Sequence, residues 1–443
     1  MFYIVETQDQ LSQLFVSEEC YINVISLNSN YHPLLTEVSL IYYKPKHGKG
    51  LILTINHSEG FYLNFENVKD FILKHENIFV LDKKVTAQLL GEEFLDSKVK
   101  DLQLLSLSIS TTPPYIHDFD THIHTHFKQL YGDKPYLNSI IPIPKHYETQ
   151  EAIFSVVKHL MVYPALNRYY NDEYVKVYYG IESQGIALNM PLFTEHFNPQ
   201  NINFSIKDEK IYTQYNLYNF TSRPTNSFNN INFAALNKSN GSREAIICQN
   251  DMLFEFDYEA YHPRILGKLI GYEFDKGSIH THLGQMYFKT DILTPEQYQA
   301  SKELTFKQLY GGVFKQYEEI PFFKKVAAYV DGLWDEFNYG GYITLVGGRK
   351  LFAKDVINPT PQKLLNYLIQ SGETFYNVNS IKGVQAYLVN RKSNIILYTY
   401  DSILVDYHKD DGKETLVEIK RLLEESFGFK VTTKYGKNYN SLK

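Results

Sequence analysis

Cysteines and long apolar runs are scarce in this sequence, and each absence narrows the kind of protein that it encodes. Only two cysteines, Cys20 and Cys248, occur in 443 residues, which argues against a disulfide framework and favours a reducing compartment. No apolar run reaches the roughly 20 residues needed to cross a bilayer. The N-terminal segment lacks the basic start and apolar core of a signal peptide. We therefore expect a cytoplasmic protein with no membrane partner.

Excess positive charge is also missing. Lys and Arg number 44 against 50 Asp and Glu, which gives a formal net charge of −6. Nucleic-acid-binding proteins usually carry a basic surface, so any such groove in this chain must be local. The hydrophobic content of 44% and the charged content of 21% are ordinary for a globular protein, and the length allows two or three domains.

The most informative stretch runs from Met252 to Leu266. Leu253, Phe254 and Phe256 predict a buried strand that ends at the carboxylate Asp257. A helical pattern follows, and a strand that delivers an Asp to its end can hold a metal near a phosphate. The alternative for this Asp alone is a helix cap or a solvated turn.

A second stretch places Lys302, Phe306 and Tyr310 at intervals of four residues, before Gly311-Gly312. On a helix they lie along one face, and the glycines end the helix. A cation followed by two aromatic rings suits a nucleotide, since the cation meets phosphates and the rings meet sugar and bases. An amphipathic core helix with a snorkelling lysine is the alternative.

A third stretch, Asn394 to Asp406, reads as strand, turn and strand with Asp401 at the tip of the hairpin. Together with Asp257 it would supply two carboxylates. Such a pair can hold two divalent ions about 4 Å apart, as in two-metal phosphoryl transfer.

In their order and spacing these stretches, with Thr344–Leu351 and Asn366–Gln370, resemble family A DNA polymerases, the bacterial DNA polymerase I type. Asp257–Arg264 is similar to motif A, Lys302–Gly311 to motif B, and Tyr400-Asp401-Ser402 to motif C. The resemblance covers roughly residues 205 to 443. It implies an α/β right-hand fold in which a palm spans residues 205–272 and 344–443 and fingers span residues 273–343.

The resemblance also implies a mechanism and a set of site residues. Two Mg²⁺ ions would be held by Asp257, Asp401 and the Tyr258 carbonyl, with Lys302 as a further catalytic group. Nucleotide binding would fall to Tyr258, His262, Phe306 and Tyr310. Contacts with primer-template DNA would come from Arg223, Asn229, Asn230, Arg264, Gly311, Arg349, Asn366 and Gln370. The expected substrates are dNTPs.

Two departures from the family pattern affect these expectations. His262 replaces the motif A glutamate that packs under the sugar, which leaves the selectivity between dNTPs and rNTPs open. Tyr298 replaces the arginine expected four residues before Lys302, so that either Lys302 or another basic residue must do its work. Phe306 at the sugar-facing position implies discrimination against dideoxynucleotides.

Residues 1–155 are similar to the RNase H-like 3′–5′ exonuclease domain that precedes this polymerase. We expect strands at 21–27, 38–43, 50–55 and 78–81, and helices at 68–75 and 84–90. The metal-binding carboxylates of that domain are largely missing: the first strand ends at Ser26-Leu27-Asn28, Thr86 stands in place of an Asp, and only Glu151 is retained. We therefore predict a degenerate domain without nuclease chemistry.

Residues 156–204 read as a linker with a vestigial thumb, because too few residues precede Ser205 for a long helical hairpin. A reduced thumb would weaken the grip on DNA, so that an accessory processivity protein, or contacts from the exonuclease-like domain, would have to compensate. The histidines at 117, 122, 124 and 126 fit a polar loop, with zinc binding as the alternative. Those at 280 and 282 fall in a segment that such polymerases often carry after motif A.

Two other functions remain open from the sequence. A single-subunit RNA polymerase or primase would share the palm and motif B, and its motif C often reads Asp-Ser. An inactive replisome scaffold is the other, although both palm carboxylates are present. The compact chain suggests a phage or mobile element, in which case the compartment is the bacterial host's cytoplasm.

Overall fold

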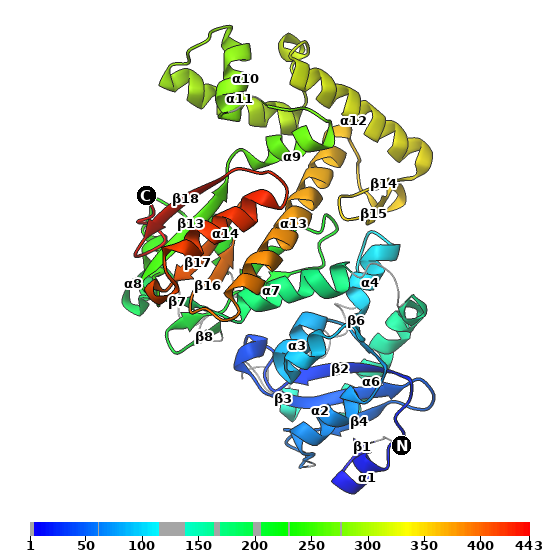
Figure 1. Cartoon of the computed structure of the whole chain (residues 1–443). Helices are drawn as coiled ribbons and strands as arrows, with labels where there is room; N and C mark the ends of the chain where they lie inside the picture. The colour runs from blue at the N-terminus through cyan, green and yellow to red at the C-terminus, as the bar shows by residue number, and fades with distance from the viewer. Residues whose placement is uncertain are drawn as a thin grey trace. The chain divides into compact units, whose positions relative to one another are not determined.

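The computed structural model describes residues 4–60, 62–114, 138–163, 169–197, 205–228, 231–274 and 277–443. The chain divides into two compact units: Met1–Tyr218 with Asn226–Ala235, and Asn219–Thr225 with Leu236–Lys443. Each unit is described by itself. The histidine-rich stretch at 117–126 and the predicted DNA contacts Asn229 and Asn230 lie outside the described residues. The predicted mixed α/β class is confirmed (Figure 1).

The first unit is built on a six-stranded mixed sheet. Its spatial order is β1 (Ile4–Val5), β4 (Leu51–Thr54), β3 (Val38–Pro45), β2 (Glu19–Ser26), β5 (Asn77–Val80) and β6 (Val99–Asp101). β3 runs antiparallel to its neighbours β2 and β4, whereas β5 pairs parallel with β2 and β6 pairs parallel with β5. The four strands and two helices predicted in this region are all present.

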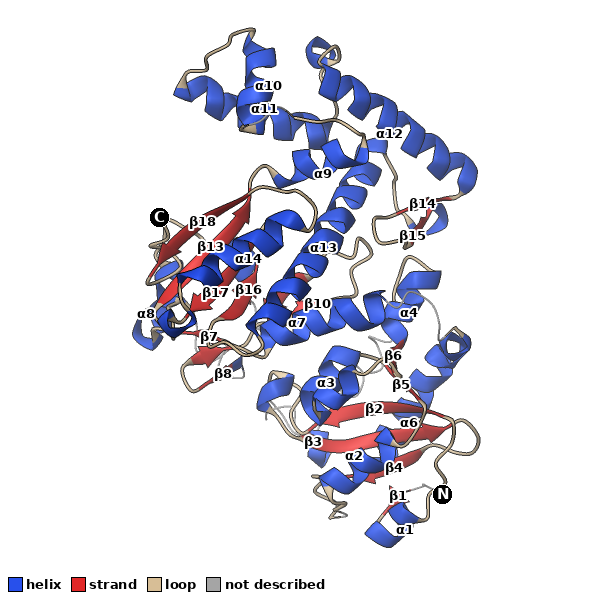
Figure 2. Cartoon of the chain, viewed as in Figure 1, coloured by secondary structure: helices blue, strands red, loops and turns tan. Residues whose placement is uncertain are grey.

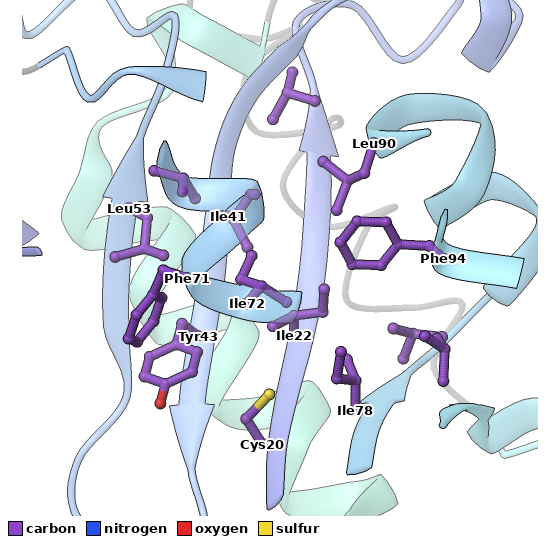
Figure 3. Close-up of a cluster of buried hydrophobic side chains, with 14 of the residues drawn as sticks. Cys20, Ile22, Ile41, Tyr43, Leu53, Phe71, Ile72, Ile78, Leu90 and Phe94 are labelled. Carbon is purple, nitrogen blue, oxygen red and sulfur yellow. The ribbon is translucent and has the colours of Figure 1, made fainter. Parts of the chain in front are cut away.

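Helices cover both faces of this sheet, because successive residues of a strand point to opposite sides. Cys20 and Ile22 of β2 join one core, against α2 (Phe65–Leu73) and α3 (Lys83–Leu90), as Figure 3 shows. Tyr21, which lies between them, joins the other core, against α4 (Leu102–Ile109) and α6 (Ile143–Val157). The short helix α1 (Gln8–Ser12) begins at a Thr7 capping box.

Short elements follow α6 along the chain. They are α7 (Val175–Glu182), β7 (Ile186–Ala187), α8 (Met190–His196), β8 (Ile206–Lys207), β9 (Lys210–Ile211), β10 (Tyr215–Asn216), β11 (Thr225–Phe228) and β12 (Ile231–Asn232). Among the described residues between α7 and β8, the longest helix is α8, of 7 residues. At 1.5 Å per residue it rises about 10 Å. The predicted domain boundaries and the vestigial thumb stay predictions.

The second unit is built on a four-stranded antiparallel sheet (Figure 2). Its order is β16 (Asn394–Tyr398), β17 (Ser402–Tyr407), β13 (Met252–Tyr258) and β18 (Val431–Gly436). α13 (Pro361–Leu388) contacts β16, α14 (Lys413–Glu425) contacts β18, and the two helices contact each other. β13 pairs with β17 on one side and β18 on the other, so the strand that carries Asp257 next to its end is held from both edges.

Besides this sheet, the described residues of the second unit form the hairpin β14 (Tyr342–Thr344) and β15 (Lys350–Phe352) and a further set of helices. The helices are α9 (Tyr261–Leu269), α10 (Ile279–Phe288), α11 (Pro295–Gly311) and α12 (Pro321–Gly340). They share one core with α13, which includes Leu266, Leu283, Leu309, Phe322 and Ile369. α11 starts at a capping box of Thr294 and Gln297, and it ends at Gly312, whose φ of 95° suits glycine.

No helix in the described part of the chain is long and apolar enough to cross a membrane.

Candidate active site

The two predicted carboxylates lie on paired strands of the second unit. Asp257, the last residue but one of β13, lies opposite Ser402 of β17, and Asp401 precedes Ser402 in the turn of the hairpin. The Tyr258 N–H donates to the Asp401 carbonyl at 2.9 Å. Tyr400 in this turn has a φ of 72°, and its carbonyl accepts from the Asn377 side chain. The turn is therefore held from α13, and it brings the two aspartates together.

The pKa values of both carboxyls are raised above their ordinary values. Burial, and next the charge of Asp401, raise the pKa of Asp257 to about 6. The Asp401 side chain reaches the surface, yet partial loss of hydration and the charge of Glu373 raise its pKa as well. A divalent cation would offset this crowding of carboxylates, so the donor set fits Mg²⁺.

The protein alone does not complete a metal site here. No group of three or more His, Cys, Asp or Glu side chains that could hold a metal occurs among the described residues. Hard divalent cations such as Mg²⁺ commonly keep waters and take oxygens from substrate phosphates. Asp257, Asp401 and the Tyr258 carbonyl could therefore hold such ions together with substrate.

The chain turns sharply between β13 and α9. Ala260 adopts a left-handed conformation with a φ of 49°, and α9 begins at the next residue. The predicted contact residues His262 and Arg264 both lie in the first turn of this helix. The Arg264 guanidinium donates to the Glu259 carbonyl at 2.8 Å and pairs with the Glu259 carboxylate at 3.2 Å. Its charge is thus already partly matched within the protein.

The three residues of motif B that are predicted to serve the nucleotide all lie on α11. The side chains of Phe306 and Tyr310 are exposed, and their rings stack with centroids 6.1 Å apart and an interplanar angle of 6°. The Lys302 ammonium lies 4.8 Å from the centre of the Tyr298 ring. The sequence pattern therefore placed these three side chains on one helix face correctly.

His280 at the start of α10 lies beside this face. Its ring centroid is 6.1 Å from that of Tyr298 and 6.2 Å from that of Phe306. Burial first, and then the charge of Lys302, lower its pKa to about 4. Its Nδ1 atom is buried and has no partner among the described residues. A neutral imidazole thus stands next to the lysine.

The structure adds a residue that no motif indicated. Glu373 of α13 is fully buried and accepts from Arg223 Nε at 3.0 Å. Its other oxygen contacts His262 Nε2, and His262 Nδ1 contacts the Tyr310 hydroxyl. The Arg223 guanidinium also lies 3.7 Å from the centre of the Tyr400 ring. One network thus joins the motif A histidine, the motif B tyrosine and the predicted primer contact.

The remaining predicted DNA contacts differ in accessibility. Gly311 is exposed, whereas Asn366 and Gln370 on α13 are partly buried. The Asn366 Oδ1 atom has no partner among the described residues. Arg349 is buried, with 2% of its surface exposed, and it donates to the Asn219 carbonyl at 3.5 Å. The fold therefore leaves little of Arg349 for a ligand to touch.

In the first unit, Thr86, which stands in place of a metal ligand, and the retained Glu151 are both engaged in contacts with the protein. The Thr86 hydroxyl donates to the Asp82 carbonyl at 2.6 Å. Glu151 accepts from the Tyr42 hydroxyl at 2.6 Å and lies 3.6 Å from the Lys44 ammonium. The one retained carboxylate is therefore held by β3.

Comparison with known proteins bears on the fold. No protein-family model and no curated protein matches this sequence. Among solved structures, the chain is similar to the POL domain of Pol1 from M. smegmatis in complex with a DNA primer-template and dNTP. The TM-score is 0.72 at 12% sequence identity, and the match covers 98% of each chain. At this identity the likeness shows the fold, which confirms at that level the resemblance to family A DNA polymerases.

Proposed function

We propose that this chain, which has the fold of a family A polymerase POL domain, is a template-directed DNA polymerase that adds dNTPs to a primer 3′-hydroxyl. The observation that carries the proposal is that Asp257 and Asp401 lie in the same unit as the Lys302–Phe306–Tyr310 face of α11, on which both rings are exposed. Fold likeness alone does not determine function, and these side chains supply the groups that nucleotidyl transfer needs.

Each group on α11 has a part in binding the incoming nucleotide. The Lys302 ammonium neutralises the triphosphate and can donate a proton to the leaving group. Phe306 and Tyr310 present ring faces to the sugar and the base. Movement of α11 toward the palm would exclude water once a nucleotide is bound.

Asp257 and Asp401 would hold two Mg²⁺ ions, with the Tyr258 carbonyl as a third donor. Bound Mg²⁺ would supply activation of the primer hydroxyl and charge neutralisation at the leaving pyrophosphate. The raised pKa values of the carboxyls support this role, because a cation relieves the repulsion between them. Arg223, Asn366 and Gln370 would orient primer and template. An accessory processivity protein that binds this chain also stays part of the proposal.

Primer extension with purified protein tests the proposal. In Mg²⁺, wild type should extend a primer with dNTPs, and Asp401→Ala should lose this activity by at least about 10³-fold, since removal of a residue essential to the chemistry costs that much. Asp410→Ala removes an exposed carboxylate of the same unit, which pairs with Lys392, and should extend normally.

Preference for rNTPs without a primer would support the RNA polymerase or primase alternative. Absence of extension on any template would favour the scaffold.

A second part of the proposal is that the chain does not proofread. With Thr86 and Glu151 bound to neighbouring protein groups, the first unit offers few acidic ligands at these positions. A single-stranded primer incubated with Mg²⁺ or Mn²⁺ and no dNTP should stay intact. Stepwise shortening from its 3′ end would contradict the proposal.

A further inference from the structure

Glu373 is a fully buried carboxylate in the middle of α13. A buried ion needs partners for both of its oxygens, since unmatched charge in the interior is costly. Glu373 has two: Arg223 Nε lies 3.0 Å from Oε1, and His262 Nε2 contacts Oε2. The backbone carbonyl of Glu373 lies 3.5 Å from the Tyr261 hydroxyl, which donates to Asn377 Oδ1 at 2.9 Å.

The backbone of α13 is placed for this contact. Gly372 precedes Glu373, and a Cβ atom added there would come within 3.2 Å of Ile265 on α9 and 3.3 Å of Val346. Only a residue without a side chain allows so close an approach of the two helices without displacement. α9 carries His262, so the approach brings Glu373 within reach of the imidazole.

Both nitrogens of the His262 ring are occupied. Nε2 contacts Glu373, and Nδ1 contacts the Tyr310 hydroxyl. The side chain is 15% exposed, so that only part of the ring is accessible. An imidazole with both nitrogens engaged has no polar group left for a substrate hydroxyl. To an incoming sugar it presents an apolar edge in a fixed position.

We propose that Glu373 is a specificity-determining residue, which positions His262 so that the sugar pocket rejects a 2′-hydroxyl. The inference rests on the proposed polymerase function, and it identifies the residue on which sugar selectivity depends. A fixed wall discriminates against an added hydroxyl because it can neither move away nor offer a compensating hydrogen bond. Arg223, stacked on Tyr400, holds the other side of the carboxylate.

The test is a measurement of kcat/KM for single incorporation of a dNTP and the matching rNTP opposite one template base. Glu373→Gln keeps the volume but turns one acceptor oxygen into a donor, so one of the two contacts must break or reverse. We expect the dNTP-to-rNTP ratio to fall about tenfold, mainly through a lower KM for the rNTP. Glu373→Ala should lower the ratio at least as far.

The variant His262→Ala shows whether Glu373 acts by positioning the imidazole or only by stabilising the fold. In that background Glu373→Gln should leave the ratio unchanged, because no ring remains to be positioned. Asp406→Asn removes another buried carboxyl of the second unit, which accepts from the Gln249 and Asn250 N–H groups. Any loss of folded enzyme in this control lowers incorporation of both sugars equally and keeps the ratio.

The outcomes separate this inference from the proposed function. Suppose that the wild type is active. If Glu373→Gln leaves its ratio unchanged, or changes the ratio equally with and without His262, the role of Glu373 is overturned and the proposed function stands. A wild type that incorporates neither sugar would overturn the proposed function and this role with it.

Discussion

Lys302 has an ammonium with no carboxylate partner among the described residues of the second unit. Its contact is the ring of Tyr298, 4.8 Å away. That tyrosine occupies the position where the family pattern has an arginine. The lysine is therefore available to a triphosphate, and the phosphate side of the site depends on it more than the family pattern would suggest.

Lys302→Met should lower kcat/KM for dNTP incorporation by about 10²-fold, as expected for loss of one group that stabilises developing charge. Steady-state primer extension measures the effect. Lys307→Met, which removes an exposed lysine of the same helix, is the matched control and should act like wild type. Equal losses in the two variants would mean that general attraction of DNA, rather than the site, accounts for the change.

The site residues differ in how far the sequence could predict them. Asp257, Asp401 and Lys302 could be predicted because each belongs to, or directly adjoins, a strand or helix. The residue pattern of such an element is visible within a few neighbouring positions. Glu373 lies 111 residues from His262 and belongs to no motif. Its importance follows from the close approach of α13 to α9, which local patterns do not encode.

At the level of elements, α7 is fastened to α3 by a buried ion pair in the first unit. The Lys84 ammonium lies 2.6 Å and 2.8 Å from the two oxygens of Glu182, and both side chains are almost completely buried. Gln88 and the Tyr215 N–H also donate to Glu182. Burial raises the pKa of Glu182, while Lys84 acts in the opposite direction.

Lys84→Met should lower the free energy of unfolding by about 3–5 kcal/mol, because it leaves Glu182 charged and buried without its cation. Urea denaturation monitored by circular dichroism measures the change. The double variant Lys84→Met/Glu182→Leu should recover part of the loss, since no unpaired charge remains. A double variant less stable than the single one would show that the Gln88 and Tyr215 contacts outweigh the ion pair.

The elements themselves were predictable where they are long enough to show a pattern. Strands β2 to β5 were predicted with each end within two residues, because their apolar runs are bounded by turn residues. β1 and β6, of 2 and 3 residues, were missed. Strands this short show no alternation, and they form because a neighbouring strand offers hydrogen bonds.

For the molecule as a whole, stability should depend on pH through Asp101. Asp101 is the last residue of β6, and its buried carboxyl accepts from the Tyr218 hydroxyl at 2.9 Å, which ties the end of the continuous first segment back to the sheet. Burial first, and the charge of Asp82 second, raise its pKa to about 7. In the unfolded chain the pKa of an aspartate is about 3.9.

Because the folded pKa is the higher one, the folded state binds the proton more tightly. The stabilisation is fully present below about pH 4 and is lost as the pH rises through about 7. When the pH is raised from 5 to 8, the melting temperature of the wild-type chain should therefore fall relative to that of Asp101→Asn. Thermal unfolding of both proteins at the two pH values measures this. Parallel pH profiles would contradict the assignment.

The sequence by itself determined the local elements and the chemistry that they carry: a strand ending in Asp257, a hairpin tip with Asp401, and a helix face with Lys302, Phe306 and Tyr310. Periodicity, capping and turn residues act over a few positions, so they can be read without the fold. Only the tertiary structure decided that Glu373 meets His262 and Arg223, that Arg349 is buried, and that the pKa of Asp257 rises. Those properties depend on which distant segments pack together and on how much water they exclude, and no local pattern specifies either.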